Sequence, residues 1–207
     1  MNGIPITEWR MTVPCPARCD RILPVSRLAV VAALLLVLTS APARANGFLT
    51  PFVGHNFGGD ASTCAGLTDC SPRRTNYGVS VGAIGTSVGF EEDLSYAKDF
   101  FGAEPGAQNS VFSAMSNLLF PGGPGRIQSY IVSSVGLVRL RVSLNQISVD
   151  SNVIGYDWGG GVNGLFTTHV GIRGDVRHFQ TFQDVNVPLV SGKLGFWRAS
   201  LGLALKF

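Results

Sequence analysis

Nine charged residues between positions 91 and 198 could form either a carboxylate active site or a network of buried ion pairs. They are Glu91, Asp93, Arg139, Arg141, Asp157, Arg173, Asp175, Arg177 and Arg198. Several recur at every second position, which is the side-chain period of a β-strand, so they share one strand face. If that face lines the inside of a barrel, the charges must pair, because unpaired charge away from water is too costly. We therefore expect an ion network that fills the interior, and we favour it over a catalytic centre.

Two further patterns could indicate chemistry, and each has a simpler interpretation. The glycines of Gly159–Gly164 match G-x-G-x-x-G. A dinucleotide site needs a helix after such a turn, whereas more strand pattern follows here. His55, His169 and His178 could serve a lipid-modifying hydrolase, but that chemistry needs a serine within hydrogen-bond reach of the base, and no such pair is evident. We expect no catalysis, no metal site and no cofactor.

The last thirteen residues, GFWRASLGLALKF, predict a membrane-crossing β-strand. From Trp197 to Phe207 every second residue is apolar, and the residues between them are mostly polar or small. The run is about as long as the ~9–11 residues that cross a bilayer at a tilt. This favours an apolar face turned toward lipid, although a soluble barrel with the opposite orientation shows the same period. A terminal Phe207 on such a strand resembles the signal that the outer-membrane assembly machinery recognises.

The first 45 residues predict a secretory signal peptide that is removed. Arg21 and Arg27 precede the apolar run Leu28–Leu38, which is followed by Ala43-Arg44-Ala45. A charged region, an apolar run of this length and an A-x-A site define such a signal. We expect cleavage between Ala45 and Asn46, which leaves residues 46–207 as one domain. Translation could start at Met1 or Met11.

Removal of the signal peptide changes the charge balance and the cysteine count. Residues 1–45 hold five of the 16 basic and two of the 13 acidic residues, so the remaining chain has no net charge. No basic surface for nucleic acid is left. Cys64 and Cys70 are the two remaining cysteines. In an exported chain such a close pair indicates a local disulfide, with a metal pair as the weaker alternative.

Residues 46–207 show eight strand-like runs, which predict an all-β, eight-stranded antiparallel up-and-down transmembrane β-barrel. Long and short connections alternate along the chain, and Asn145–Ser151 and Gln183–Leu194 are read as long loops. Long outer loops and tight periplasmic turns are typical of outer-membrane barrels, and eight strands leave room only for side chains inside. Six aromatic residues are expected on the outer face as interfacial girdles: Tyr77, Tyr96, Tyr130, Tyr156, Trp158 and Trp197. In the fifth run, Val138 and Leu140 are placed on that outer face, opposite Arg139 and Arg141.

Four segments carry a resemblance to a known family: LTPFVGHNFGGD, GFEEDLSYAKDFFG, HVGIRGDVRHFQ and FWRASLGLALKF. Together they resemble the small OmpA/OmpX-like outer-membrane β-barrel domain. The resemblance implies this fold, a location in the bacterial outer membrane, and contact with lipid and the assembly machinery. It does not imply one activity, because family members include adhesins, stress proteins and enzymes. Two functions stay open: a structural or interaction barrel whose external loops bind a surface partner, and a narrow pore or soluble lipocalin-like ligand carrier.

Overall fold

The structure is a computed structural model that describes residues 46–61, 64, 74–103, 105–123, 125–144, 147–187 and 190–207. The expected signal peptide lies outside these residues, so its cleavage after Ala45 remains a prediction. Cys70 also lies outside them.

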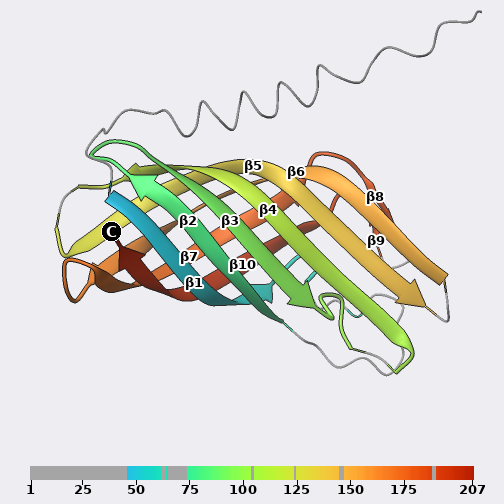
Figure 1. Ribbon diagram of the computed structural model, residues 1–207. Coiled ribbons are helices and arrows are strands. Elements are labelled where there is room, and N and C mark those ends of the chain that lie inside the picture. The colour runs from blue at the N-terminus through green and yellow to red at the C-terminus, as the bar shows by residue number, and fades with distance from the viewer. Residues whose placement is uncertain are drawn as a thin grey trace, which may run out of the picture. The chain divides into compact units, whose positions relative to one another are not determined.

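Eight strands form one closed antiparallel barrel, as the sequence predicts (Figure 1). They are β1 (Asn46–Phe57), β2 (Thr75–Ile84), β3 (Gly89–Lys98), β4 (Ala107–Pro121), β5 (Ile127–Leu144), β6 (Ile147–Leu165), β7 (Val170–Thr181) and β10 (Gly195–Lys206). Each of these eight strands pairs with the next one in this order, and β1 pairs with β10 to close the sheet. A two-stranded hairpin, β8 (Val185–Val187) with β9 (Val190–Gly192), lies within the connection from β7 to β10.

The connections define two ends of the barrel. At the turn end, short segments join β2 to β3, β4 to β5 and β6 to β7. The first is closed by a hydrogen bond from the Gly85 N–H to the Val88 carbonyl, at 2.9 Å. The opposite end, called the loop end below, carries the β1–β2, β3–β4, β5–β6 and β7–β10 connections. Both the first strand and the last therefore have their outer termini at the turn end.

One expected loop is strand instead. The stretch Asn145–Ser151 was predicted as a long connection, but β5 and β6 pair as far as Leu144 with Ile147. These two strands are the longest in the barrel, with 18 and 19 residues, and they extend past their neighbours at the loop end (Figure 1). Ile147 and Val149 alternate with the polar residues Ser148 and Asp150, which is a strand pattern that continues the hairpin.

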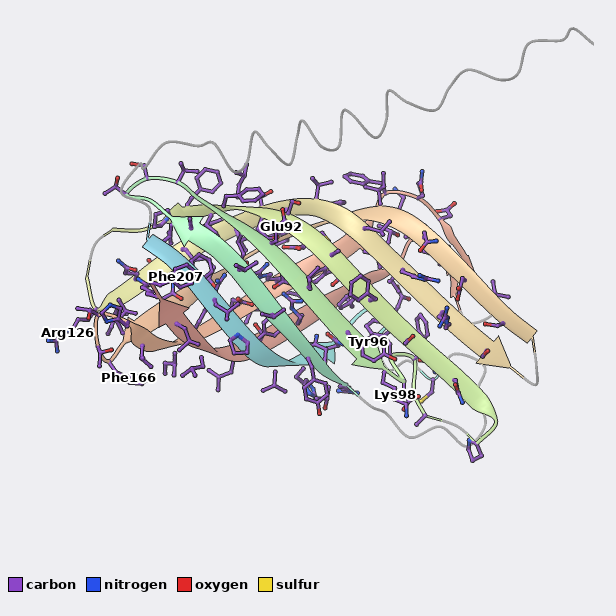
Figure 2. All side chains as sticks on the ribbon, viewed as in Figure 1. Glu92, Tyr96, Lys98, Arg126, Phe166 and Phe207 are labelled. Carbon is purple, nitrogen blue, oxygen red and sulfur yellow. The ribbon has the colours of Figure 1, made fainter. Side chains whose placement is uncertain are left out.

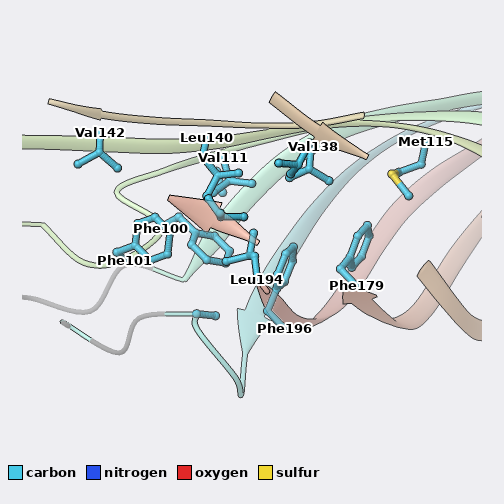
Figure 3. Packing of buried hydrophobic residues seen from close by; sticks show 14 residues of the cluster. Phe100, Phe101, Val111, Met115, Val138, Leu140, Val142, Phe179, Leu194 and Phe196 are labelled. Carbon is cyan, nitrogen blue, oxygen red and sulfur yellow. The ribbon is translucent and has the colours of Figure 1, made fainter. Parts of the chain in front are cut away.

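The interior is layered along the barrel axis. At the loop end, buried apolar residues form a plug that includes Phe100, Phe101 and Phe196, together with Leu140 and Leu194 (Figure 3). A smaller apolar cluster closes the turn end: Phe48, Ile84, Leu119, Tyr130 and Val132. Between these two layers lie buried charged residues.

The outer face carries a belt of exposed apolar side chains, as expected for an inside-out amphipathic barrel. Along β10, Leu201 and Leu203 are about half exposed, whereas the alternate residues Arg198 and Ala204 are buried. Aromatic residues mark the loop end of this belt, among them Tyr77, Tyr96 and Trp158. Within the described residues, no helix is long and apolar enough to span a membrane.

Candidate functional site

Seven of the nine predicted lumen residues meet in the middle layer of the barrel. They are Glu91 and Asp93 from β3, Asp157 from β6, Arg173, Asp175 and Arg177 from β7, and Arg198 from β10. Each is at most 8% exposed. They come together because β3, β6, β7 and β10 all alternate in phase, with every second side chain turned inward.

Arg177 is the centre of this network and is fully buried. Its Nη2 donates to Glu91 Oε1 at 2.9 Å and to Asp175 Oδ2 at 3.3 Å. Its Nη1 lies 3.8 Å from Asp93 Oδ2 and 4.0 Å from Asp157 Oδ1. One guanidinium therefore faces four carboxyl groups from three strands, which makes it the shared counter-ion of the layer.

Arg198 makes the most regular pair in the layer. Its two terminal nitrogens donate to the two carboxylate oxygens of Asp93, each at 3.0 Å, in a bidentate geometry. The guanidinium carbon also lies over the rings of Phe52 and Phe179, at 4.9 and 4.8 Å from their centroids. Ser80 donates a further hydrogen bond to Asp93. This arrangement replaces the water that both charges lose.

Tyr130 belongs to the network, which corrects its predicted place in the outer girdle. It is only 4% exposed, its hydroxyl donates to Asp175 at 2.8 Å, and it accepts from Arg173 Nε at 2.6 Å. Arg173 also pairs with Glu91 through Nη1. Local pattern could not reveal this role, because an aromatic residue two positions before an apolar one fits either face of a barrel strand.

Polar side chains on other strands complete the partners of the carboxylates. Asn117 of β4 donates to Glu91, Ser134 of β5 to Asp157, and Ser200 of β10 to Asp175. With Ser80 of β2, hydrogen bonds to the four carboxylates come from every barrel strand other than β1, β3 and β6. The layer therefore ties the circumference of the barrel together.

Glycines of β6 provide the space for this layer. Gly159 and Gly161, from the G-x-G-x-x-G pattern, lie in a strand rather than before a helix, as expected. A Cβ atom on Gly161 would lie 2.6 Å from the Cβ of Asp175, and one on Gly159 would lie 2.8 Å from the Cα of Arg177. These contacts are too close for any side chain, so the pattern serves packing.

Arg139 and Arg141 are not in the lumen, and this part of the prediction was wrong. Their side chains are 46% and 56% exposed, and both pair with Asp150 on the outer face. The inward positions of β5 here are Val138 and Leu140, which join the apolar plug. The interpretation failed because both faces of β5 are largely apolar, and these arginines lie beyond the apolar belt, where an outward charge meets water.

The corrected lumen has an uneven charge count. Within the described residues it contains four carboxyl groups and three guanidinium groups. Asp157 has the weakest contacts of the four: Ser134 donates to it at 2.6 Å, but the nearest guanidinium nitrogen is 4.0 Å away. Its Oδ2 has no hydrogen-bond partner among the described residues. Asp157 is therefore the carboxyl group that the network compensates least.

The histidines are placed on the outer surface or in a turn. His178 packs against Trp197 and Trp158, with ring centroids 4.8 and 5.8 Å away. His169 contacts Thr168 in the β6–β7 turn, and His55 is exposed on β1. Within the described residues, no group of three or more His, Cys, Asp or Glu side chains could hold a metal ion.

Two predicted features involve the chain end and the cysteines. The Phe207 N–H donates to the Gly47 carbonyl at 2.9 Å, and its exposed ring lies over that glycine beside the closing pair of strands. Cys64 lies near the apolar plug, where its N–H donates to the Phe101 carbonyl. Because Cys70 lies outside the described residues, the Cys64–Cys70 bridge remains a prediction.

Comparison with known proteins identifies the fold. Family profiles and curated proteins give no match to this sequence. Among solved structures, neisserial surface protein A is 17% identical, with 78% of this chain and 97% of that chain covered and a TM-score of 0.61. The outer membrane protein OprG from Pseudomonas aeruginosa is 12% identical, with 79% and 96% covered and a TM-score of 0.50. The chain thus has the fold of small eight-stranded outer-membrane barrels.

Proposed function

We propose that the protein is an integral barrel of the bacterial outer membrane that conducts poorly and presents its loop end to the outside. The observation that carries this proposal is an apolar outer belt around an interior whose middle layer is made of buried charged residues. A soluble barrel has the opposite arrangement, because its apolar side chains fill the core. The exposed side chains of Leu201 and Leu203 on β10, Ile131 on β5 and Ile154 on β6 are compatible with lipid contact.

A closed lumen supports a structural or interaction role over a pore. Arg177 and Arg198 cross the interior at its middle and are fully buried. The apolar plug, with Phe100 and Phe101, fills the loop end above them. A conducting path needs water along its length, whereas both layers exclude it. A role in binding therefore falls to the loop end and to the outer surface, and the narrow pore is the alternative.

The last strand supports a proposal about assembly. Phe207 lies on the outer face at the turn end, where a periplasmic assembly factor can reach it (Figure 2). We expect deletion of Phe207 to lower the amount of folded protein in the outer membrane. Normal insertion of the deletion variant contradicts this role.

Fractionation and electrical recording test the main proposal. The protein should require detergent for extraction and should run at a different gel position before and after heating, as folded barrels do. In planar bilayers, it should give little or intermittent conductance. Extraction without detergent supports the soluble ligand carrier, and a stable, large ohmic channel supports the pore.

A further inference from the structure

A cavity of about 400 Å³ lies on the outer face of β3, β4 and β5, near the loop end. It is separate from the lumen network and contains the two arginines that the sequence placed inside the barrel. Its cationic lining residues are Lys98, Arg139 and Arg141. Tyr96 and Lys98 lie at the end of the barrel opposite Phe207 (Figure 2).

The strand register gives this cavity two levels. Tyr96 of β3 is paired with Phe112 of β4, which is paired with Arg139 of β5. Two residues farther toward the loop end, Lys98 is paired with Ser110, which is paired with Arg141. The rings of Tyr96 and Phe112 thus lie at the membrane side of the cavity, level with Arg139, and the remaining cations and Ser110 lie beyond them.

This level coincides with the edge of the apolar belt. On β5 the outward residues change from Val135 and Leu137, which are about half exposed, to the charged Arg139 and Arg141. On β3 they change from Leu94 and Tyr96 to Lys98. Aromatic residues favour the interface between hydrocarbon and headgroups, so the cations level with them and just beyond them lie at headgroup depth.

The charge at this site favours an anion. Asp150 pairs with both arginines, at 2.8 Å to Arg141 Nε and 2.9 Å to Arg139 Nη2, and so holds the two guanidinium groups side by side. Asp99 also lines the cavity but is buried. Three cations against two carboxylates leave a net positive charge. Asp150 occupies Nε and Nη2 of Arg141, at 2.8 and 3.1 Å, so the other guanidinium N–H groups and the Lys98 ammonium are the donors left for the oxygens of a phosphate.

We propose that this cavity binds the phosphorylated headgroup of a lipid in the outer leaflet, an inference that rests on the proposed membrane location. Lys98 and the two arginines bind the phosphate, and the hydroxyl groups of Ser110 and Ser143 donate to polar atoms of the headgroup. The rings of Tyr96 and Phe112 contact the start of the acyl chains. A lipid fits this site better than a soluble anion because the aromatic side of the cavity opens onto the apolar belt.

The experiment titrates the folded protein, in micelles of a neutral detergent, with the diphosphorylated glycolipid lipid A. Native mass spectrometry counts the bound lipid. We expect saturation near one lipid per protein, with no competition from phosphatidylcholine. Since one cation near an anionic lipid contributes about a fivefold gain in affinity, the variant Arg139→Gln/Arg141→Gln should bind roughly 25-fold more weakly. The control Arg126→Gln/Lys193→Gln removes two exposed cations elsewhere and should leave the affinity unchanged.

Three results overturn the inference: equal affinity for phosphatidylcholine, an unchanged affinity in the arginine variant, or displacement of lipid A by an equal concentration of inorganic phosphate. The last result indicates a site for a free anion. Heat-dependent gel mobility, measured on the same samples, separates the two proposals. A wild-type protein that never shows the folded band contradicts the membrane function, whereas a folded variant that binds normally contradicts the lipid site alone.

Discussion

The pair of Asp93 and Arg198 allows a sharp test of the lumen network, because Asp93 has other hydrogen-bonding and charged partners and Arg198 depends mainly on Asp93. In Asp93→Asn, Arg198 loses the carboxylate that binds both of its terminal nitrogens. Among the described residues, no other carboxylate oxygen lies within 4.0 Å of Arg198, so at contact distance it keeps one amide oxygen and the rings of Phe52 and Phe179. In Arg198→Met, by contrast, Asp93 retains the hydrogen bond from Ser80 at 3.0 Å and Arg177 at 3.8 Å.

Breaking a buried pair by removing one partner costs about 3–5 kcal/mol, whereas replacing both partners by well-packed groups is often neutral. We expect Asp93→Asn to fall within that range and Arg198→Met to cost less. The double variant Asp93→Asn/Arg198→Met should cost less than Asp93→Asn alone. Its coupling free energy should reach about 1–3 kcal/mol, as for residues that share one network.

The measurement is equilibrium unfolding in urea from lipid vesicles, followed by tryptophan fluorescence and by the heat-dependent gel shift. All four proteins of the cycle need the same slope against urea, so that their free energies of unfolding can be compared. Losses that simply add, or a larger loss for Arg198→Met than for Asp93→Asn, would refute the assigned partners.

Three further outcomes are expected in the same unfolding assay. Gly161→Ala should destabilise the barrel by more than about 1 kcal/mol, because its Cβ would overlap Asp175. The control Gly174→Ala should be close to neutral, because its Cβ would lie 3.8 Å from the nearest atom. Equal effects of the two variants contradict the packing role of the β6 glycines. Leu203→Arg should lower the free energy of unfolding by about 2–4 kcal/mol if this exposed residue faces the middle of the bilayer. Leu203→Gln should lower it less. Equal losses argue that the side chain lies outside lipid. Asp157→Asn should lower the free energy of unfolding less than Asp93→Asn, because the guanidinium nitrogen nearest to Asp157 is 4.0 Å away. The reverse order contradicts the conclusion that Asp157 is the least compensated carboxyl group.

The sequence predicted the barrel and most of its lumen because charge and period agree in three strands. In β3, β7 and β10, most charged residues share one face and most large apolar residues the other, so parity places Asp93, Arg177 and Arg198 inside, although Glu92 breaks the apolar face of β3. In β5 this logic failed. Arg139 is charged but lies at the loop-end edge of the apolar belt, where the outer face meets water, and a period of two does not measure depth.

Two other features depend on long-range contacts that local patterns do not contain. The apolar plug recruits Phe100 and Phe101 from the β3–β4 connection, where polar residues and glycine indicate an ordinary loop. Tyr130 reaches residues that are 43 and 45 positions away in the chain. Such contacts follow from barrel closure, which fixes which inward side chains share a level.

The distance along the chain between partners in the lumen has a consequence for how the barrel assembles. Glu91 and Arg177 are 86 residues apart, and Asp93 and Arg198 are 105 residues apart. Pairing of β3 with its neighbours β2 and β4 brings no arginine to these carboxylates, so they must stay hydrated while the sheet is open. Arg198, the bidentate partner of Asp93, is in place only after β10 has paired with both β7 and β1. Sealing of the cylinder and loss of its internal water are therefore one late, cooperative event, and a half-closed intermediate gains little by entering the bilayer core.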